Sequence, residues 1–437
     1  MSTTPPGAPS PPGTPPLPVT PALRDVGPDA WRALAAAFLG WMLDGMDIML
    51  YAFALTAIRS EFGLSAGMVG ALASVTLVTS AAGGAVAGYL ADRFGRARVL
   101  VVSILVYSVF TAATATAGSV AALALWRGLV GFGLGAEWSA GSVLVAETWP
   151  SRHRGKAIGF VQSGWAIGYL LAAALAALVL PRWGWRTLFL LGVLPALVTV
   201  WIRRRVAEPE VWRLARARPA GAAGGAAARG PTFRAAIGML ARPPLRRLAL
   251  SATALATVLL FAYWGLFTWM PTFLASPVSE GGAGLGIVRS SAWIVAMQVG
   301  AFLGYNLFGI IADRLGRRPA VALFVGGAAL IVPVYGLMAQ RPTALLLLGP
   351  LVGFLGHGYF SLFGAMLAEL FPSAIRATAQ GACYNIGRAA SALAPFAIGA
   401  AADRMGYGAA LALTSGFYIA GLGLIFLLPE TRGRDLA

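Results

Sequence analysis

Residues 88–98 read GYLADRFGRAR, and residues 309–319 read GIIADRLGRRP. The second stretch repeats the first 221 positions later, with Gly, Ala-Asp-Arg and Gly-Arg in the same places. A second pair follows at an offset of 222: AETWPSRHRGKAIGF begins at Ala146, and AELFPSAIRATAQGA begins at Ala368. Matched stretches in register are hard to obtain by chance, so we predict that the chain contains two copies of one unit.

Composition places both copies in a membrane. Hydrophobic residues make up 58% of the chain and charged residues 11%, and the mean hydropathy is +0.75. A globule of this composition would not be soluble, whereas a spanning helix needs about 20 apolar residues. The predicted fold class is an all-α membrane protein with twelve transmembrane helices in two six-helix bundles related by the internal repeat. The spans are expected at residues 32–58, 67–91, 98–117, 120–147, 155–179, 186–204, 247–275, 290–312, 319–338, 343–369, 376–401 and 408–428.

The chain is expected to divide into five parts. Residues 1–30 are dense in proline and lack a cationic start, so they predict a disordered cytoplasmic tail and not a signal peptide. The first six-helix bundle is predicted over residues 31–205 and the second over residues 246–428. Residues 206–245, basic and then rich in Ala and Gly, predict a cytoplasmic linker, and residues 429–437 predict a second cytoplasmic tail.

The net charge of +17 has a membrane explanation. Arginines gather between alternate apolar runs, whereas the other loops carry them singly, and this alternation is the positive-inside pattern. It predicts a protein of the cytoplasmic (inner) membrane with the lipid bilayer as a partner and with both termini in the cytoplasm. Nucleic-acid binding is not needed to explain the charge. The clusters are Arg93, Arg96 and Arg98; Arg152, Arg154 and Lys156; Arg203, Arg204 and Arg205; and Arg314, Arg317 and Arg318.

Patterns typical of catalysis are missing from the sequence. The single cysteine, Cys383, excludes an intrachain disulfide and a Cys-rich metal site. We find no nucleophile–base pair, metal cluster or phosphate-binding loop. The prediction is a protein that is not an enzyme and that uses no metal and no cofactor.

The doubled stretch at Gly88 and Gly309 resembles the signature loop of the major facilitator superfamily, which lies between helices 2 and 3 and between helices 8 and 9. The resemblance covers the chain except the tail and the linker, and it implies that these loops close the cytoplasmic side in one state. Gly88 and Gly309 are expected to allow close helix contact. Glu147 and Glu369 resemble the family's gate acids, paired with arginines such as Arg93 or Arg314. The predicted gating residues are Gly88, Asp92, Arg93, Arg96, Glu147, Arg154, Gly309, Asp313, Arg314, Arg317, Glu369 and Arg376.

Finer matches point to organic anions. The stretch LGAEWSAGSVLVAETWPSRHRGKAIGFVQSGWAIGYLLAA, the following GWRTLFLLGVLPAL and the stretch RRRVAEPEVW resemble the sialate:proton symporter branch, which includes lactate and pyruvate carriers. LDGMD, residues 43–47, resembles the aromatic acid:proton symporters, in which two aspartates occupy this place. These resemblances imply a carboxylate substrate without naming one compound.

Five ionisable residues inside the predicted spans have no counterpart in the other copy. Such groups cost several kcal/mol in a bilayer unless they are paired, protonated or hydrated, so they are candidates for transport chemistry. The offset of 222 carries Asp44, Asp47, Arg127 and Glu137 to Leu266, Trp269, Gly349 and Tyr359, and it carries Arg388 back to Ala166.

Asp47 and Arg127 are the predicted proton-coupling pair. With a rise of 1.5 Å per residue, Arg127 falls roughly one long side chain outward of Asp47. The layout resembles the helix 1 aspartate and helix 4 arginine of the sugar-porter branch. A carboxyl group in a low dielectric holds its proton more tightly, and an approaching arginine releases it, so a pair that separates during transport would link proton binding to conformation. The alternative is a fixed pair that orients helices 1 and 4.

Two further acids extend this prediction. Asp44 is a candidate second proton site or an acid that orients the substrate, although the sequence names no partner for it. Glu137 lies just inward of the centre of helix 4, and a partnership with a helix 1 or helix 5 group such as Gln162 is plausible.

Arg388 is the candidate for holding the anionic group of the substrate, because arginine stays charged when buried and grips a carboxylate with two hydrogen bonds. Asn385 and Tyr384, one turn earlier, could add hydrogen bonds. His357 could carry protons or bind an anion, or it could be a neutral residue hydrogen-bonded between helices. Together with Gln162 these are the predicted substrate-binding residues.

The function predicted is proton-coupled import of a small organic anion, a mono- or aromatic carboxylate or a sialate-like acid, by a monomeric symporter that works by alternating access. An exporter of organic anions or drugs, or a neutral-sugar porter, remains an alternative.

Overall fold

The computed structural model describes residues 26–210, 213, 233–243, 245–372 and 375–432, and no strand occurs among them. The predicted tail is therefore almost wholly outside the described residues, as is most of the predicted linker. The first half of the chain forms a run of long helices: α1 (Pro28–Phe62), α2 (Ala66–Phe94), α3 (Arg96–Thr114), α4 (Val120–Thr148), α5 (Ser151–Leu190) and α6 (Pro195–Arg205).

The second half contains more and shorter helices. They are α8 (Phe233–Leu240), α9 (Leu245–Phe267), α10 (Met270–Ala275), α11 (Gly286–Leu315), α12 (Arg317–Leu337), α13 (Pro342–Gly358), α14 (Phe360–Leu370), α15 (Arg376–Ser391), α16 (Ala394–Met405), α17 (Tyr407–Ala412) and α18 (Thr414–Leu424).

Nine helical stretches of the described chain are long and apolar enough to cross a membrane. One of them, Gly155–Arg205, contains both the fifth and the sixth predicted spans, and a kink at Gly184, where the backbone is non-helical with a φ of 72°, separates the two. The tenth predicted span covers α13 and α14 and the eleventh covers α15 and α16, and neither is among the nine stretches. The predicted all-helical class is confirmed, and the described helices overlap each of the twelve predicted spans.

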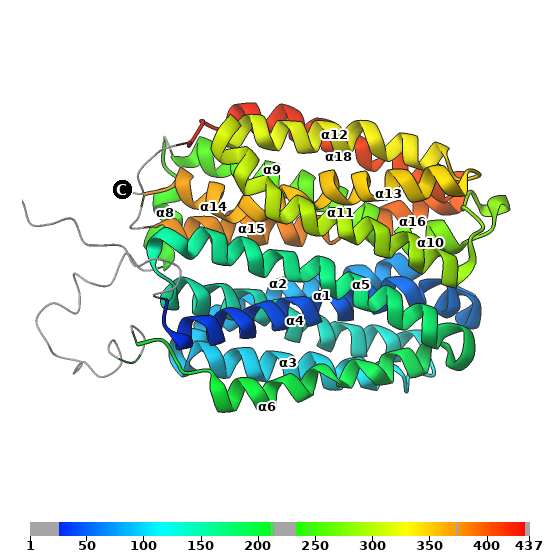
Figure 1. The fold of residues 1–437 in the computed structure, drawn as a ribbon, viewed down its shortest axis with the longest axis horizontal. Helices are drawn as coiled ribbons and strands as arrows, with labels where there is room; N and C mark the ends of the chain where they lie inside the picture. Colours follow the sequence, from blue (N-terminus) through cyan, green and yellow to red (C-terminus); the bar gives the residue numbers. More distant parts are fainter. Residues whose placement is uncertain (1–25, 211–212, 214–232, 244, 373–374, 433–437) are drawn as a thin grey trace, which may run out of the picture.

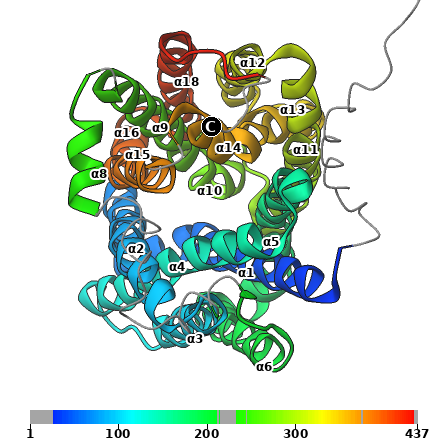
Figure 2. The ribbon, with the colours of Figure 1, turned by 90° about the vertical axis from the view of Figure 1, so that its left-hand side faces the viewer.

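The helices form two groups that follow the order of the chain. Seen from one end, α1–α6 lie together in one half of the molecule and α8–α18 in the other (Figure 2). Within the first group α1 packs on α5 and α4 on α2 and α3, and within the second α11 packs on α13 and α9 on α15. The two groups, called here the N-terminal and C-terminal bundles, meet mainly along α5 with α11 and along α2 with α16.

The long helices run side by side between two ends of the molecule (Figure 1). At the signature end, α2 and α11 finish at Phe94 and Leu315, and the repeated loops follow. At the opposite end, α1 passes into α2 between Phe62 and Ala66. The terms signature end and opposite end are used below in this sense.

Two glutamates complete the repeat at the signature end. Glu208 accepts hydrogen bonds from the backbone N–H groups of Arg96 (2.7 Å) and Arg98 (3.1 Å) at the start of α3. Glu430 does the same for Arg317 (2.8 Å) and Arg318 (3.0 Å) at the start of α12. Each carboxylate satisfies backbone donors that a helix start leaves unpaired. Neither glutamate was predicted from the sequence to have this role.

Candidate functional site

Asp47 of α1 and Arg127 of α4 approach each other in the middle of the N-terminal bundle. The distance between the Asp47 carboxylate and the Arg127 guanidinium is 3.7 Å, and both side chains are almost completely buried. The hydroxyl of Thr111, from α3, donates a short hydrogen bond to the other carboxylate oxygen. The predicted approach of the two residues is present, whereas Thr111 was not predicted.

Two aromatic rings lie close to the guanidinium of Arg127. Its central carbon lies 4.9 Å from the ring centre of Tyr51 and 5.9 Å from that of Phe189. These rings stabilise a buried cation without neutralising it. Arg127 also lines a small pocket to which Trp264 and Thr268 of the other bundle contribute, so one side of the ion pair is open to the bundle interface.

A second buried group of charges lies across the interface. Asp44 of α1 and Glu137 of α4 are neighbours, and Arg388 of α15, from the C-terminal bundle, lies within electrostatic range of both. All three are at most 5% exposed. Both carboxylate oxygens of Asp44 and one of Glu137 have no donor among the described side chains. No partner for Asp44 could be predicted from the sequence, and in the structure Glu137 and Arg388 are its charged neighbours.

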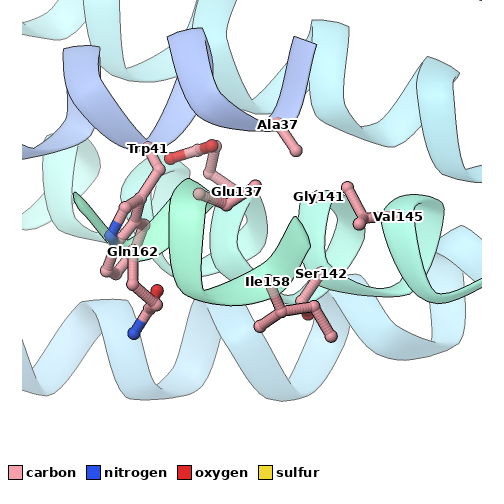
Figure 3. A pocket seen from close by; sticks show the side chains of 9 residues that line it. Ala37, Trp41, Glu137, Gly141, Ser142, Val145, Ile158 and Gln162 are labelled. Carbon is pink, nitrogen blue, oxygen red and sulfur yellow. The ribbon is translucent and has the colours of Figure 1, made fainter. Parts of the chain in front are cut away.

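Glycine at position 40 allows Glu137 to lie so close to α1. A Cβ atom at Gly40 would come within 2.4 Å of the Glu137 carboxylate. Glu137 also lines a small pocket between α1, α4 and α5, and Figure 3 shows its carboxyl group directed toward α1, next to Trp41. Gln162 lines the same pocket, so the structure brings the predicted partners Glu137 and Gln162 to one cavity.

The other predicted substrate-binding residues are distributed unevenly. Tyr384 is half-buried and lies within electrostatic range of Arg388 and Asp44. Asn385 instead donates its amide hydrogen bond to the carbonyl of Gly381 in its own helix, at 3.0 Å. Tyr384 therefore lies near the charges of the site, whereas the described hydrogen bond of Asn385 is made within its own helix.

His357 lies fully buried among aromatic rings. Its ring centre is 4.0 Å from that of Phe267 and 5.1 Å from that of Tyr263. Nδ1 lies 3.1 Å from the carbonyl oxygen of Gly353. Because a carbonyl can only accept, Nδ1 is the donor in this bond. The bond stays within α13, so the predicted alternative of a histidine hydrogen-bonded between helices is not seen at Nδ1.

Aromatic side chains cross the bundle interface beside these charges. Trp165 of α5 packs against Trp41 at 4.9 Å and against Trp264 of α9 at 5.9 Å, measured between ring centres. The indole N–H groups of all three have no acceptor among the described atoms. The hydroxyl of Tyr169 donates to the carbonyl of Phe267 across the same interface, at 2.9 Å. Trp41 and Trp165 were not among the predicted site residues. The sequence does not show whether a tryptophan in an apolar helix lines a cavity or packs in the core.

The gate acids at the signature end pair with arginines of their own bundle. Glu147 binds Arg96 at 2.9 Å, and Glu369 binds Arg317 at 3.3 Å. Arg317 also pairs with Asp313, at 2.7 Å. In the structure the gate acids thus pair with Arg96 and Arg317, whereas Arg93 and Arg314 were the partners suggested from the sequence.

The remaining gating predictions have varied outcomes. The close helix contact predicted at Gly309 is wrong for this structure, because a Cβ atom there would meet no atom within 4 Å. Arg93 lies with its guanidinium 5.5 Å from the ring centre of Phe94. Arg314 is exposed and Arg376 half-buried. The side chains of Gly88, Asp92 and Arg154 lie outside the described part of the chain.

Comparison with known proteins gives consistent matches. The family model described as Major Facilitator Superfamily matches residues 37–305. A protein of Acinetobacter baylyi named "Cis,cis-muconate transport protein" is 34% identical over 86% of this chain and 88% of its own length. One of Cupriavidus pinatubonensis, named "Probable 4-methylmuconolactone transporter", is 36% identical over 93% of this chain and 92% of its own. The crystal structure of a D-xylose–proton symporter has the same fold, with a TM-score of 0.73 at 19% identity over 93% of this chain and all of the other.

Proposed function

The chain belongs to the Major Facilitator Superfamily, and from this premise we propose that it is a proton-coupled symporter that imports a small organic anion. The observation that carries the proposal is the buried group formed by Asp44, Glu137 and Arg388, which brings acids of one bundle close to a cation of the other. Relatives named for transport of muconate and a muconolactone support an organic-acid substrate.

Alternating access supplies the transport cycle. The arginine clusters at the signature end support its assignment to the cytoplasmic side of the inner membrane, with both termini there. At the opposite end Arg59 of α1 pairs with Glu280 of the C-terminal bundle at 3.0 Å. We therefore infer that this structure represents a state in which the outer end is closed.

Charge balance supplies a reason for coupling. The buried groups at the interface comprise two cations, Arg127 and Arg388, and three acids, Asp44, Asp47 and Glu137. With all acids ionised, the set carries one negative charge, which one bound proton neutralises. A substrate carboxylate adds another negative charge, and uncompensated charge in a low dielectric is costly. Anion binding at Arg388 thus favours uptake of a further proton.

Each residue has a distinct role in this proposal. Arg388 binds the substrate carboxylate through its guanidinium, and Tyr384 lies where it can add a hydrogen bond. Asp44 and Glu137 lose their counter-charge to the substrate and accept a proton in exchange. Asp47 releases its proton when Arg127 is close and takes one up when helix movement separates them.

Uptake into proteoliposomes tests the proposal. Labelled cis,cis-muconate, benzoate, lactate, sialate and xylose are offered with and without an inward proton gradient. We expect accumulation of at least one acid and none of xylose, with at least tenfold weaker apparent affinity for Arg388→Ala, because a charge-assisted bidentate contact is lost. Arg341→Ala, at an exposed arginine, is the matched control.

The variant Asp47→Asn tests the coupling of transport to protons. This variant should retain exchange of labelled for unlabelled substrate but lose accumulation driven by the proton gradient. Gradient-driven accumulation that equals wild type, unchanged affinity of Arg388→Ala, or gradient-driven transport of xylose alone would contradict the proposal.

A further inference from the structure

A third copy of the signature motif lies at the other end of the molecule. Residues 399–406 read GAAADRMG, which matches GYLADRFG at residues 88–95 and GIIADRLG at residues 309–316 in the pattern G-x-x-A-D-R-x-G. This copy is not part of the twofold repeat, because the offset of 222 carries Asp403 back to Pro181.

The three copies fold in the same way. Each ends a helix at its last glycine, and the backbone dihedral angles there are φ 110° and ψ 152° at Gly95, φ 102° and ψ 160° at Gly316, and φ 80° and ψ 161° at Gly406. In each, the N–H of that glycine donates to the carbonyl of the motif alanine four residues earlier. The third copy is therefore a structural equivalent of the other two, placed at the opposite end, where α16 passes into α17.

The aspartate of this copy binds the start of a helix in the other bundle. One carboxylate oxygen of Asp403 accepts a hydrogen bond from the N–H of Ala66, and the other accepts one from the N–H of Gly67, both at 2.8 Å. Both donors belong to the first turn of α2, and Ser65 of the same bundle satisfies the N–H of Met68. A carboxylate at this position also interacts favourably with the partial positive charge of the helix start.

Small residues allow the two helices to come this close. A Cβ atom at Gly67 would lie 3.4 Å from the Cβ atom of Ala400, and one at Gly399 would lie 2.6 Å from the carbonyl oxygen of Ala66. Beside this contact the hydroxyl of Tyr407 accepts a hydrogen bond from Arg59 across the same interface, at 2.9 Å.

We propose that residues 399–406 form the latch of the opposite end, in which Asp403 caps α2 only while that end is closed. Opening separates α16 from α2, so it removes both donors from the carboxylate and leaves the first N–H groups of α2 without their partner. The contact therefore stabilises the closed outer end and hence the state open to the cytoplasm. The orientation rests on the proposed function, whereas the latch itself rests on the contacts described here.

A cross-link measures the closed state directly. In a Cys383→Ser background, Gly67→Cys and Ala400→Cys place two thiols at a Cβ separation close to that of a disulfide. We expect oxidation to join them, to stop transport, and reductant to restore it. Adding Asp403→Ala should slow cross-linking about tenfold, because two charge-assisted hydrogen bonds of the closed state are lost. Asp403→Asn, which keeps the shape of the side chain and can accept only through its amide oxygen, should give an intermediate rate.

A second measurement reports opening from outside. In intact cells an impermeant maleimide should label Ala73→Cys, which lines the pocket beside Arg127, faster when Asp403 is replaced. Asp313→Ala is the matched control, because it removes the aspartate of the second copy, whose described partner, Arg317, lies in its own bundle. It should not slow cross-linking or raise labelling.

Unchanged cross-linking and labelling in Asp403→Ala or Asp403→Asn would overturn the proposal, as would normal transport by the fully cross-linked protein. Labelling and cross-linking need no substrate. A wrong substrate assignment would therefore leave these two results intact, and the failures of the two proposals are distinguishable.

Discussion

Thr111 of α3 binds the carboxylate of Asp47 in α1, and it therefore contributes to the electrostatics of the proposed proton site. Its hydroxyl donates to the carboxylate oxygen of Asp47 that does not pair with Arg127. A hydrogen bond to the ionised form of a carboxyl group favours that form, so Thr111 and Arg127 act in the same direction. Thr111 is thus a positioning residue for the proposed coupling step.

Thr111→Val is expected to move the pH profile of uptake to higher pH by about one unit, because ionised Asp47 loses one donor while the side chain keeps its shape. Thr111→Ser should restore the wild-type profile. Thr114→Val is the control, since the hydroxyl of Thr114 bonds to the carbonyl of Phe110 in its own helix. Equal pH profiles for Thr111→Val and wild type would show that this hydrogen bond does not affect the proton site.

Prediction at the residue scale was limited by contacts between distant segments. The rise of a helix showed that Arg127 could reach Asp47, because both belong to long spans whose depths can be counted, and the resemblance to the sugar-porter layout made them the predicted pair. Thr111 and the partners of Asp44 could not be predicted, since a single sequence does not give the rotation of each helix about its axis. The residues without a counterpart in the repeat were nonetheless the charged residues that the structure brings together.

At the scale of the element, close packing of α1 on α5 depends on a glycine. A Cβ atom at Gly168 would lie 1.9 Å from the carbonyl oxygen of Met42, whereas one at Gly159, in the same helix, would meet nothing within 4 Å. Membrane helices commonly use small residues for such approach.

Gly168→Ala is expected to lower stability by about 1–3 kcal/mol through overpacking, whereas Gly159→Ala should change it by less than about 0.5 kcal/mol. Thermal unfolding of the purified variants in detergent measures both. Equal unfolding temperatures for the two variants would mean that α1 can shift away from α5 at little cost.

The cap of α12 is sensitive to acid. Burial alone would raise the pKa of Glu430, but hydrogen bonds from the backbone N–H groups of Arg317, Arg432, Arg318 and Thr431 outweigh it and hold the pKa below its usual value. A group whose pKa is depressed on folding contributes stability above its unfolded pKa, near 4.3, and loses it as the pH falls through the folded value. The cap should therefore act fully at neutral pH.

Glu430→Gln is expected to cost about 1 kcal/mol at pH 7 and progressively less below about pH 4, where wild-type Glu430 is protonated as well. Unfolding temperatures of both proteins across this pH range test the expectation. Glu210→Gln, at an exposed glutamate near the equivalent cap of α3, should show no such convergence. A difference between Glu430→Gln and wild type that stays constant with pH would exclude the carboxylate as its source.

The helices could be predicted from the sequence more readily than the breaks within them. Apolar length was enough to predict where helices occur, because the bilayer imposes one thickness on each span. The break at Tyr359, between α13 and α14, was not predicted, since it follows from local packing and not from hydropathy. The capping roles of Glu208 and Glu430 were also missed, because each acts on a helix more than a hundred residues earlier in the chain.

For the whole molecule, the described contacts between the bundles run along α5 with α11 and α2 with α16. These contacts do not involve the predicted linker. We expect that a protease site inserted within residues 221–228 can be cut with transport retained, because membrane-embedded helices hold the two bundles together. Uptake before and after cutting, with the uncut insertion variant as control, is the measurement. Loss of uptake on cutting would assign the linker a direct part in transport.

The two-part architecture followed from the repeat, because a duplication can be recognised within a single sequence. The family followed from the resemblance of the doubled loop to a known signature. The contact of Asp403 with α2 did not follow, although its motif is present in the sequence. A motif outside the register of the repeat gives no indication of the end at which it lies or of the helix that it binds.

The separation of Asp47 from Arg127 along the chain affects how the protein is made. Synthesis delivers α1 to the membrane first, and Arg127 follows 80 residues later, in α4. Until then α1 carries two acids without the cation that pairs with one of them, and each ionised acid at a helix centre opposes insertion by about 2.5–3.5 kcal/mol. With both acids ionised, α1 is therefore expected to become stable in the membrane only after α4 has been inserted beside it.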